Sequence, residues 1–158
     1  MKKHLFSLAM AIVMMFSLSI TSFAAEAPVS DEFYVVGHVL TQEETAEFWQ
    51  LHAQKARVSM ASTIFLPKNV DGTQGNGTSR FTADSTTVSF VITNAPNTAT
   101  YNVVLKNSYG NAVSFYYKDI PINNPIACRG LIVGETYYFE VSSNDCPASG
   151  CTANYEIY

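Results

Sequence analysis

The chain has few of the residues that build metal centres and hydrolytic active sites. It contains three cysteines and three histidines, and neither a Cys-x-x-Cys nor a His-x-x-x-His pair occurs. A structural zinc site needs about four ligands at short spacings, so we expect no metal. The Gly-x-Ser-x-Gly sequence around many nucleophilic serines is also absent. The sequence therefore predicts neither a metal nor another cofactor.

Positive charge and long apolar runs are scarce as well. The chain has nine basic and 13 acidic residues, which give a net charge of −4. The basic residues form no stripe, so a nucleic acid is not an expected partner. After residue 24, no apolar stretch approaches the ~20 residues that a membrane-spanning helix needs. We expect no membrane span in that part of the chain.

The first 24 residues have the three regions of a secretory signal peptide. Lys2 and Lys3 give a positive start, residues 5–20 form an apolar run, and Ser22-Phe23-Ala24 offers small residues before a cleavage point. The alternative is a membrane anchor, but the run is short for a spanning helix. We expect cleavage after Ala24 and a secreted, extracellular protein that is a monomer.

Residues 25–61 are predicted to hold one strand and the single strong helix of the chain. Thr41 and Glu44 form a capping box, and the helix is expected to run from Thr41 to Arg57. Its apolar face is predicted from residues spaced by three and four, namely Ala46, Trp49, Ala53, Ala56 and Met60, widened by Phe48 and Leu51. We expect this face to pack on the main domain; a helix that binds a partner is the alternative.

Residues 62–158 are predicted to form a β-sandwich. From residue 81 onward apolar and polar residues alternate, and turn signals recur about every 8–12 residues. No helices alternate with these strands, which argues against a parallel sheet. We therefore expect a mainly β protein, an antiparallel immunoglobulin-like or jelly-roll sandwich with one N-terminal α-helix. The predicted core comprises Phe90, Ile92, Val103, Leu105, Phe115, Tyr137, Phe139 and Val141.

The cysteines are Cys128, Cys146 and Cys151. In an oxidising compartment two of them are expected to pair. We predict a Cys146–Cys151 disulfide, because Pro147 and Gly150 bracket a turn between two strand ends. Pairing of Cys128 with either partner stays open on sequence alone, and an unpaired cysteine is a free thiol or an intermolecular link.

The segment from Leu131 to Val141 resembles the E–F corner of fibronectin type III domains. The matching positions are Leu131, Gly134, Tyr137, Phe139 and Val141, and Tyr101-Asn102-Val103 is similar to the Tyr-x-Val of strand C. The resemblance covers about residues 86–158 and implies a sandwich whose corner tyrosine bonds to backbone a few residues upstream. The strand B tryptophan is missing, with Phe90 the nearest candidate, and Val133 replaces the family's proline.

The same region resembles a second family, the bacterial prepeptidase C-terminal sandwich. That family has a Gly-x-Tyr-Tyr segment before a last strand that begins with tyrosine, here Tyr155 to Tyr158. Both families are β-sandwiches of secreted proteins, and neither resemblance implies catalysis.

Candidate catalytic residues are few. His38 and His52 are the histidines outside the signal segment, and we interpret His52 as a packing residue beside Trp49. The paired carboxylates that sugar hydrolysis needs could come from Glu135, Glu140, Asp119 or Asp145, although Glu140 on a strand would normally face solvent. The residues therefore favour a protein without catalytic residues, and a hydrolase is the less favoured reading.

Binding is the favoured function. If Tyr101, Phe115, Tyr117, Tyr137 and Phe139 point inward, Tyr116 and Tyr138 point outward, where they can stack on a sugar or contact a protein. The helix covering that face is the structural alternative. We expect a secreted module that binds cell-surface or matrix polysaccharide or protein. The alternative is a structural protein that acts through a strand edge, the helix or the odd cysteine.

Overall fold

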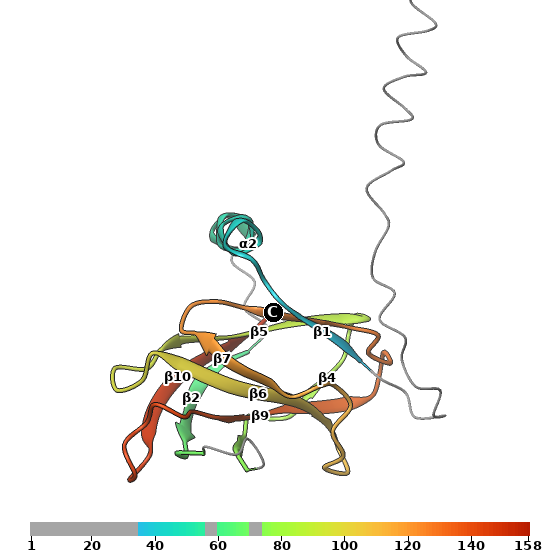
Figure 1. Cartoon of the computed structure of the whole chain (residues 1–158). Coiled ribbons are helices and arrows are strands. Elements are labelled where there is room, and N and C mark those ends of the chain that lie inside the picture. The colour runs from blue at the N-terminus through green and yellow to red at the C-terminus, as the bar shows by residue number, and fades with distance from the viewer. Residues whose placement is uncertain (1–34, 56–59, 70–73) are drawn as a thin grey trace, which may run out of the picture. The chain divides into compact units, whose positions relative to one another are not determined.

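The computed structural model describes residues 35–55, 60–69 and 74–158, which all belong to one compact unit of the chain (Figure 1). The predicted signal peptide and residues 25–34 lie outside the described residues. The elements are β1 (Val36–Val39), α2 (Gln42–Lys55), β2 (Met60–Leu66), β3 (Asn76–Gly77), β4 (Phe81–Thr82), β5 (Thr87–Asn94), β6 (Thr100–Asn107), β7 (Tyr117–Pro121), β8 (Ile126–Arg129), β9 (Thr136–Ser142) and β10 (Cys151–Ile157). The predicted mainly β fold with one helix near the N-terminus is confirmed.

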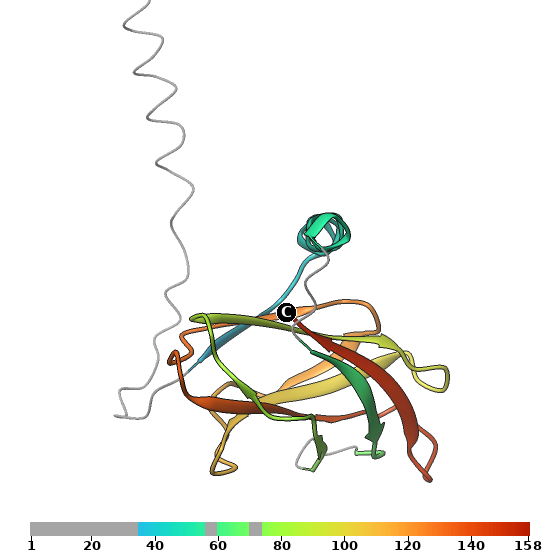
Figure 2. The ribbon, with the colours of Figure 1, turned by 180° about the vertical axis from the view of Figure 1, so that it is seen from behind.

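The strands form two antiparallel sheets that pack face to face. The first sheet has the order β1-β8-β5-β10-β2, and the second has the order β3-β9-β6-β7, with β4 also paired to β9. The two layers are seen edge-on in Figure 1 and from behind in Figure 2. The fold is therefore the predicted antiparallel sandwich, since each sheet buries one face against the other.

The core follows the two-residue period of the strands. Seven of the eight predicted core residues belong to the buried cluster, all except Phe115. Phe90 and Phe139 stack across the two sheets with their ring centroids 4.6 Å apart. Phe90 also packs beside Tyr101 and Tyr155, so aromatic side chains fill the centre of the sandwich.

The prediction that Phe115 lies in the core is wrong, because its side chain is 66% exposed. The segment before Tyr117 does not continue the β7 strand. Ser114 is buried instead, and its hydroxyl accepts a hydrogen bond from the Leu105 amide at 2.9 Å. The β6–β7 register also shifts between Tyr101 and Val103. The residues of β7 that point into the core are therefore Tyr117 and Ile120.

Helix α2 begins with the predicted capping box. The Thr41 amide donates to Glu44 Oε2 at 2.8 Å, and the Glu44 amide donates to Thr41 Oγ1 at 3.3 Å. Backbone hydrogen bonding at the helix N-terminus is thereby satisfied by side chains. The helix is described as far as Lys55, so the predicted end at Arg57 lies outside the described residues.

The helix lies on the outer side of the first sheet (Figures 1 and 2). Trp49 Nε1 donates to the Asn123 carbonyl at 3.1 Å, and the rings of Phe48 and His52 contact Tyr158. The predicted apolar face is only partly correct, because Ala46, Leu51 and Ala53 are exposed. Met60, also predicted for this face, belongs to strand β2. The helix contacts the loop at Asn123 and the last residue, Tyr158, rather than a flat apolar surface. The side of the helix that is covered therefore differs from the predicted one. Among the described residues, no helix has the length and hydrophobicity to cross a membrane.

The predicted disulfide bond is present between Cys146 and Cys151, whose Cα atoms are 5.7 Å apart. It closes a loop between β9 in the second sheet and β10 in the first. Cys128 is a free thiol, fully buried in the core, and burial raises its pKa to about 12. An intermolecular link through Cys128 would therefore require the folded domain to open.

The corner implied by the family resemblance has the expected hydrogen bond. The Ile132 amide donates to the Tyr137 hydroxyl at 3.1 Å. The topology differs, however, because the last two strands of immunoglobulin-like domains share a sheet, whereas β9 and β10 lie in different sheets. The structure is a β-sandwich, and it does not identify the chain as a fibronectin type III domain.

Candidate functional site

The outer face of the second sheet brings together the two tyrosines predicted to bind. Strand β9 alternates, so Tyr137 and Phe139 enter the core while Tyr138 and Glu140 point outward. Strand β6 pairs Lys106 with Tyr138 and Val104 with Glu140, which places these side chains on the same outer face. We define the tyrosine face as Tyr116, Tyr138, Arg80, Lys106, Lys118 and Glu140, together with Asn102 and Ser142.

Tyr138 lies over two glycines. A Cβ on Gly77 would come within 3.1 Å of the Tyr138 ring, and one on Gly110 would lie 3.7 Å from its hydroxyl. Gly77 is thus the residue that lets the ring lie close to the backbone. The Arg80 guanidinium carbon stands over the ring, 5.7 Å from its centroid. Tyr138 is half-buried and positioned by backbone below and a cation above.

Tyr116 comes from the loop before β7 and reaches across the sheet. Its hydroxyl hydrogen-bonds with Ser142 Oγ on β9 at 3.0 Å, and Lys118 Nζ stands over its ring at 5.6 Å from the centroid. Burial raises the pKa of Tyr116, with the charges of Glu140 and Asp119 acting in the same direction. This tyrosine therefore remains a neutral phenol and is fixed at its hydroxyl end.

A mostly buried ion pair lies between the strands of this face. Lys106 Nζ and Glu140 Oε2 are 2.6 Å apart. Nearby, the buried Asn102 accepts a hydrogen bond from the Asp119 amide and donates one to Asn144 Oδ1. Asn144 in turn donates to Asp119 Oδ1 at 2.9 Å. The polar groups between the rings are thus satisfied within the protein, which makes the face rigid.

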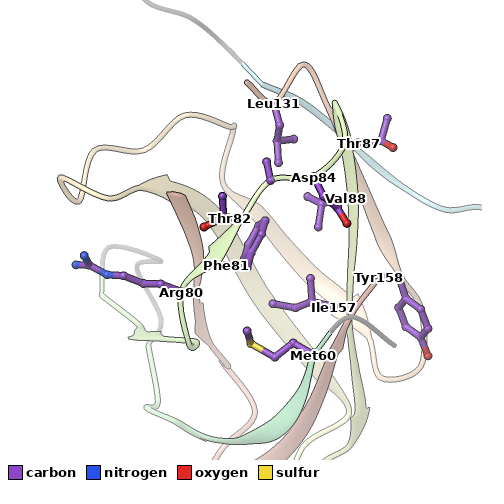
Figure 3. Close-up of a pocket in the computed structure, with 11 residues that line it drawn as sticks. Met60, Arg80, Phe81, Thr82, Asp84, Thr87, Val88, Leu131, Ile157 and Tyr158 are labelled. Carbon is purple, nitrogen blue, oxygen red and sulfur yellow. The ribbon is translucent and has the colours of Figure 1, made fainter. Parts of the chain in front are cut away.

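A cavity of about 310 Å³ opens on the flank of the sandwich beside β4 (Figure 3). Its lining includes the apolar side chains of Met60, Phe81, Val88, Leu131 and Ile157. Charged groups are sparse there, and Arg80 points away from the cavity in Figure 3. The cavity can accept an apolar group, but it brings together no acid–base pair.

The histidines occupy separate settings. His38 Nε2 lies 2.9 Å from Glu44 Oε2 at the start of the helix. His52 packs between the rings of Phe48 and Tyr158, as its interpretation as a packing residue requires. His52, Asp84 and Ser85 line one open hollow of about 370 Å³. The Ser85 hydroxyl, however, accepts a hydrogen bond from the Thr87 amide at 3.3 Å, so it stabilises the turn before β5.

The four candidate carboxylates have different surroundings. Glu140 is held by Lys106, Asp119 by Asn144, and Asp145 accepts a hydrogen bond from Thr100 Oγ1 at 2.7 Å. Glu135 is exposed in the turn before β9. Within the described ranges, no group of three His, Cys, Asp or Glu side chains is arranged to hold a metal ion.

Sequence reasoning missed the cations that stand over the tyrosines. A further cation of the face, Lys106, occupies an outward-pointing position of β6, so its placement could be predicted from the alternating pattern. The positions of Lys118 and Arg80 could not be predicted in this way. Lys118 lies at the register shift between β6 and β7, and Arg80 lies in the loop before the two-residue strand β4. Comparison of the chain with family models, curated proteins and solved structures gives no significant match.

Proposed function

We propose that the protein is a secreted module, without catalytic residues of its own, that binds surface or matrix polysaccharide through the tyrosine face. One observation carries the proposal: Tyr116 and Tyr138 lie on the outer face of one sheet, each held by fixed neighbours. A ring that is already immobilised loses little conformational entropy when a sugar stacks on it. A pair of such rings is a platform for a chain of sugar units.

The expected affinity is weak. An aromatic stacking contact contributes on the order of 1 kcal/mol, so two rings alone do not give tight binding. Attachment to a polymer with many repeats gains from multivalency. The proposal therefore favours a polymer over a single small sugar.

The test is affinity electrophoresis of the purified protein in gels that contain soluble polysaccharides. The double variant Tyr116→Ala, Tyr138→Ala should lose most of the retardation. Tyr109→Ala is the matched control, since Tyr109 is 86% exposed and lines a different hollow, with Val35 and Ile132. Retardation of the double variant equal to that of the parent would overturn the proposal.

A further variant separates binding from folding. Tyr116→Phe keeps the ring but removes the hydroxyl that meets Ser142. It should retain binding, because stacking uses the ring face. Circular dichroism and the unfolding midpoint establish that each variant is folded before binding is compared.

The secretion part of the proposal has its own test. Intact mass spectrometry of the exported protein should give a chain that begins at Ala25. A mass that retains residues 1–24 would contradict cleavage.

A protein partner is the second candidate, favoured by one observation at another place. Large apolar side chains are exposed at several positions, among them Val36, Tyr109, Phe115, Ile132 and Val133. Tyr109 and Ile132 line a common hollow of about 130 Å³. Exposed apolar groups of this kind are typical of protein contacts. Loss of cell binding in Tyr109→Ala, with the tyrosine face intact, would favour this candidate.

A further inference from the structure

The cations over the two tyrosines distinguish among polysaccharides. Arg80 stands over Tyr138, and Lys118 stands over Tyr116. The ion pairs among the described residues are His38–Glu44 and Lys106–Glu140, so neither capping cation has a carboxylate at salt-bridge distance. The face thus presents two rings, each with a positive charge that no protein carboxylate pairs with.

A neutral sugar gains little by displacing such a cation. Cation–π and ring-stacking interactions are of similar strength, so exchanging one for the other is nearly neutral. A sugar with a carboxylate differs, because the displaced cation can pair with that carboxylate while the sugar stacks on the ring. Charge-assisted hydrogen bonds from an arginine or lysine to a carboxylate are stronger than neutral ones.

The distribution of charged residues also favours a negatively charged ligand. The chain as a whole is acidic, with a net charge of −4, yet Arg80, Lys106 and Lys118 all belong to the tyrosine face. Glu140 on this face is neutralised by Lys106 at 2.6 Å. Asp119, on β7, accepts a hydrogen bond from the Asn144 amide and is the other carboxylate whose charge acts on Tyr116. Arg80, Lys106 and Lys118 against the carboxylates of Glu140 and Asp119 leave one net positive charge on this face, and the charges that stand over the rings are cations.

We infer that the ligand of the tyrosine face is an acidic polysaccharide that carries carboxylates, such as a uronic acid polymer. This inference rests on the proposed function and narrows its ligand class. Each bound unit would place its sugar ring on Tyr116 or Tyr138 and its carboxylate against Lys118 or Arg80. Lys106 would stay paired with Glu140.

The experiment uses the protein with three polymers, polygalacturonate, alginate and hyaluronan. Each polymer is used in its native form and after reduction of its carboxylates to alcohols, which removes the charge and keeps the backbone. Binding is measured by affinity electrophoresis and by calorimetry. We expect at least one native polymer to bind, at least tenfold more tightly than its reduced form, with affinity that falls as salt rises.

Two variants test the named residues. Arg80→Gln with Lys118→Gln should lower the affinity for the native polymer at least tenfold and abolish the preference for the native polymer over its reduced form. Arg129→Gln is the control, since Arg129 is an exposed cation on β8, in the other sheet. The control should bind as the parent does.

The outcomes separate the inference from the proposed function. Equal binding of native and reduced polymers, lost in the tyrosine double variant, keeps the proposed function and overturns the inference. An equal loss in the Gln pair and in its control also overturns the inference. If none of the three native polymers binds, the inference of an acidic polysaccharide is overturned. If neutral polysaccharides also fail to bind, the proposed function is overturned. Retention on cells that survives removal of surface glycans and is destroyed by protease would indicate a protein partner instead.

Discussion

Tyr137 and Tyr138 are neighbours in β9, yet they belong to opposite faces of the same sheet. Tyr137 is 4% exposed, and its hydroxyl accepts the Ile132 amide at a corner of the fold. Tyr138 lies outside on Gly77, with Arg80 over its ring. Because strand side chains alternate, one residue step converts a structural tyrosine into one available to a ligand. Changes on the inner face should therefore affect stability, and changes on the outer face should affect binding.

Phe139→Ala gives the largest expected effect on the inner face. The side chain is fully buried and stacks on Phe90, so its loss removes buried area and leaves a cavity. The free energy of unfolding should fall by roughly 3–5 kcal/mol. Denaturant unfolding measures the change.

Phe115→Ala is the matched control for this prediction. Phe115 is exposed, and substitutions at such positions usually change stability by less than about 0.5 kcal/mol. If Phe115→Ala cost as much as Phe139→Ala, the division of this sheet into inner and outer faces would be wrong.

The chain crosses from the second sheet to the first between β9 and β10, and removal of the disulfide bond tests what stabilises this connection. Replacing Cys146 and Cys151 by Ala removes the constraint on a loop whose ends are five residues apart. Chain entropy for so short a loop predicts a loss of about 2 kcal/mol, smaller than for a long loop. Thermal unfolding with and without reductant measures it. The parent in reductant should then resemble the variant, and an unchanged midpoint in both would show that packing alone holds the crossing.

Tyr137→Phe and Tyr138→Phe compare the two neighbours directly. Tyr137→Phe leaves the Ile132 amide without its acceptor and should cost about 1 kcal/mol. Tyr138→Phe should change the free energy of unfolding by less than about 0.5 kcal/mol. Urea titrations of both variants give the two values. Equal values would remove the distinction between the corner tyrosine and the face tyrosine.

The smallest effect is expected at the helix on the outer side of the other sheet. The pKa of Glu44 is lowered from 4.5 to about 2, first by the Thr41 amide and then by His38 and the Thr41 hydroxyl. A carboxylate whose pKa is lowered by folding stabilises the fold above about pH 4.5, and this contribution is lost as the pH falls through 2. Titration of the Glu44 carboxyl by NMR should give a midpoint near 2.

His38→Ala sharpens this last prediction. The midpoint should rise but stay below 4.5, because the Thr41 amide is the larger cause. A midpoint of 4.5 in this variant would assign the lowered pKa to His38 alone.

Much of the fold was predictable because it depends on local patterns. Alternation in β5, β6 and β9 identified seven of eight core residues, and the capping box located the start of α2. The eighth, Phe115, failed because β7 begins only at Tyr117, and the alternation of residues does not reveal where a strand begins. The apolar face of α2 failed in part because the helix meets the Asn123 loop and Tyr158, which are remote in sequence.

The candidate site divides in the same way. The outward direction of Tyr138 followed from parity in β9, whereas Tyr116 lies before β7, where strand parity does not apply; the Cys146–Cys151 pair followed from a short turn. The cations did not, because Arg80 and Tyr138 are 58 positions apart in number and meet only where the β3–β4 segment runs beside β9. The sequence by itself determined a sandwich, a capped helix and a local disulfide, because these need only short-range order. Tertiary structure decided that Arg80 covers Tyr138 and that α2 lies on the opposite sheet, because those contacts depend on strand order.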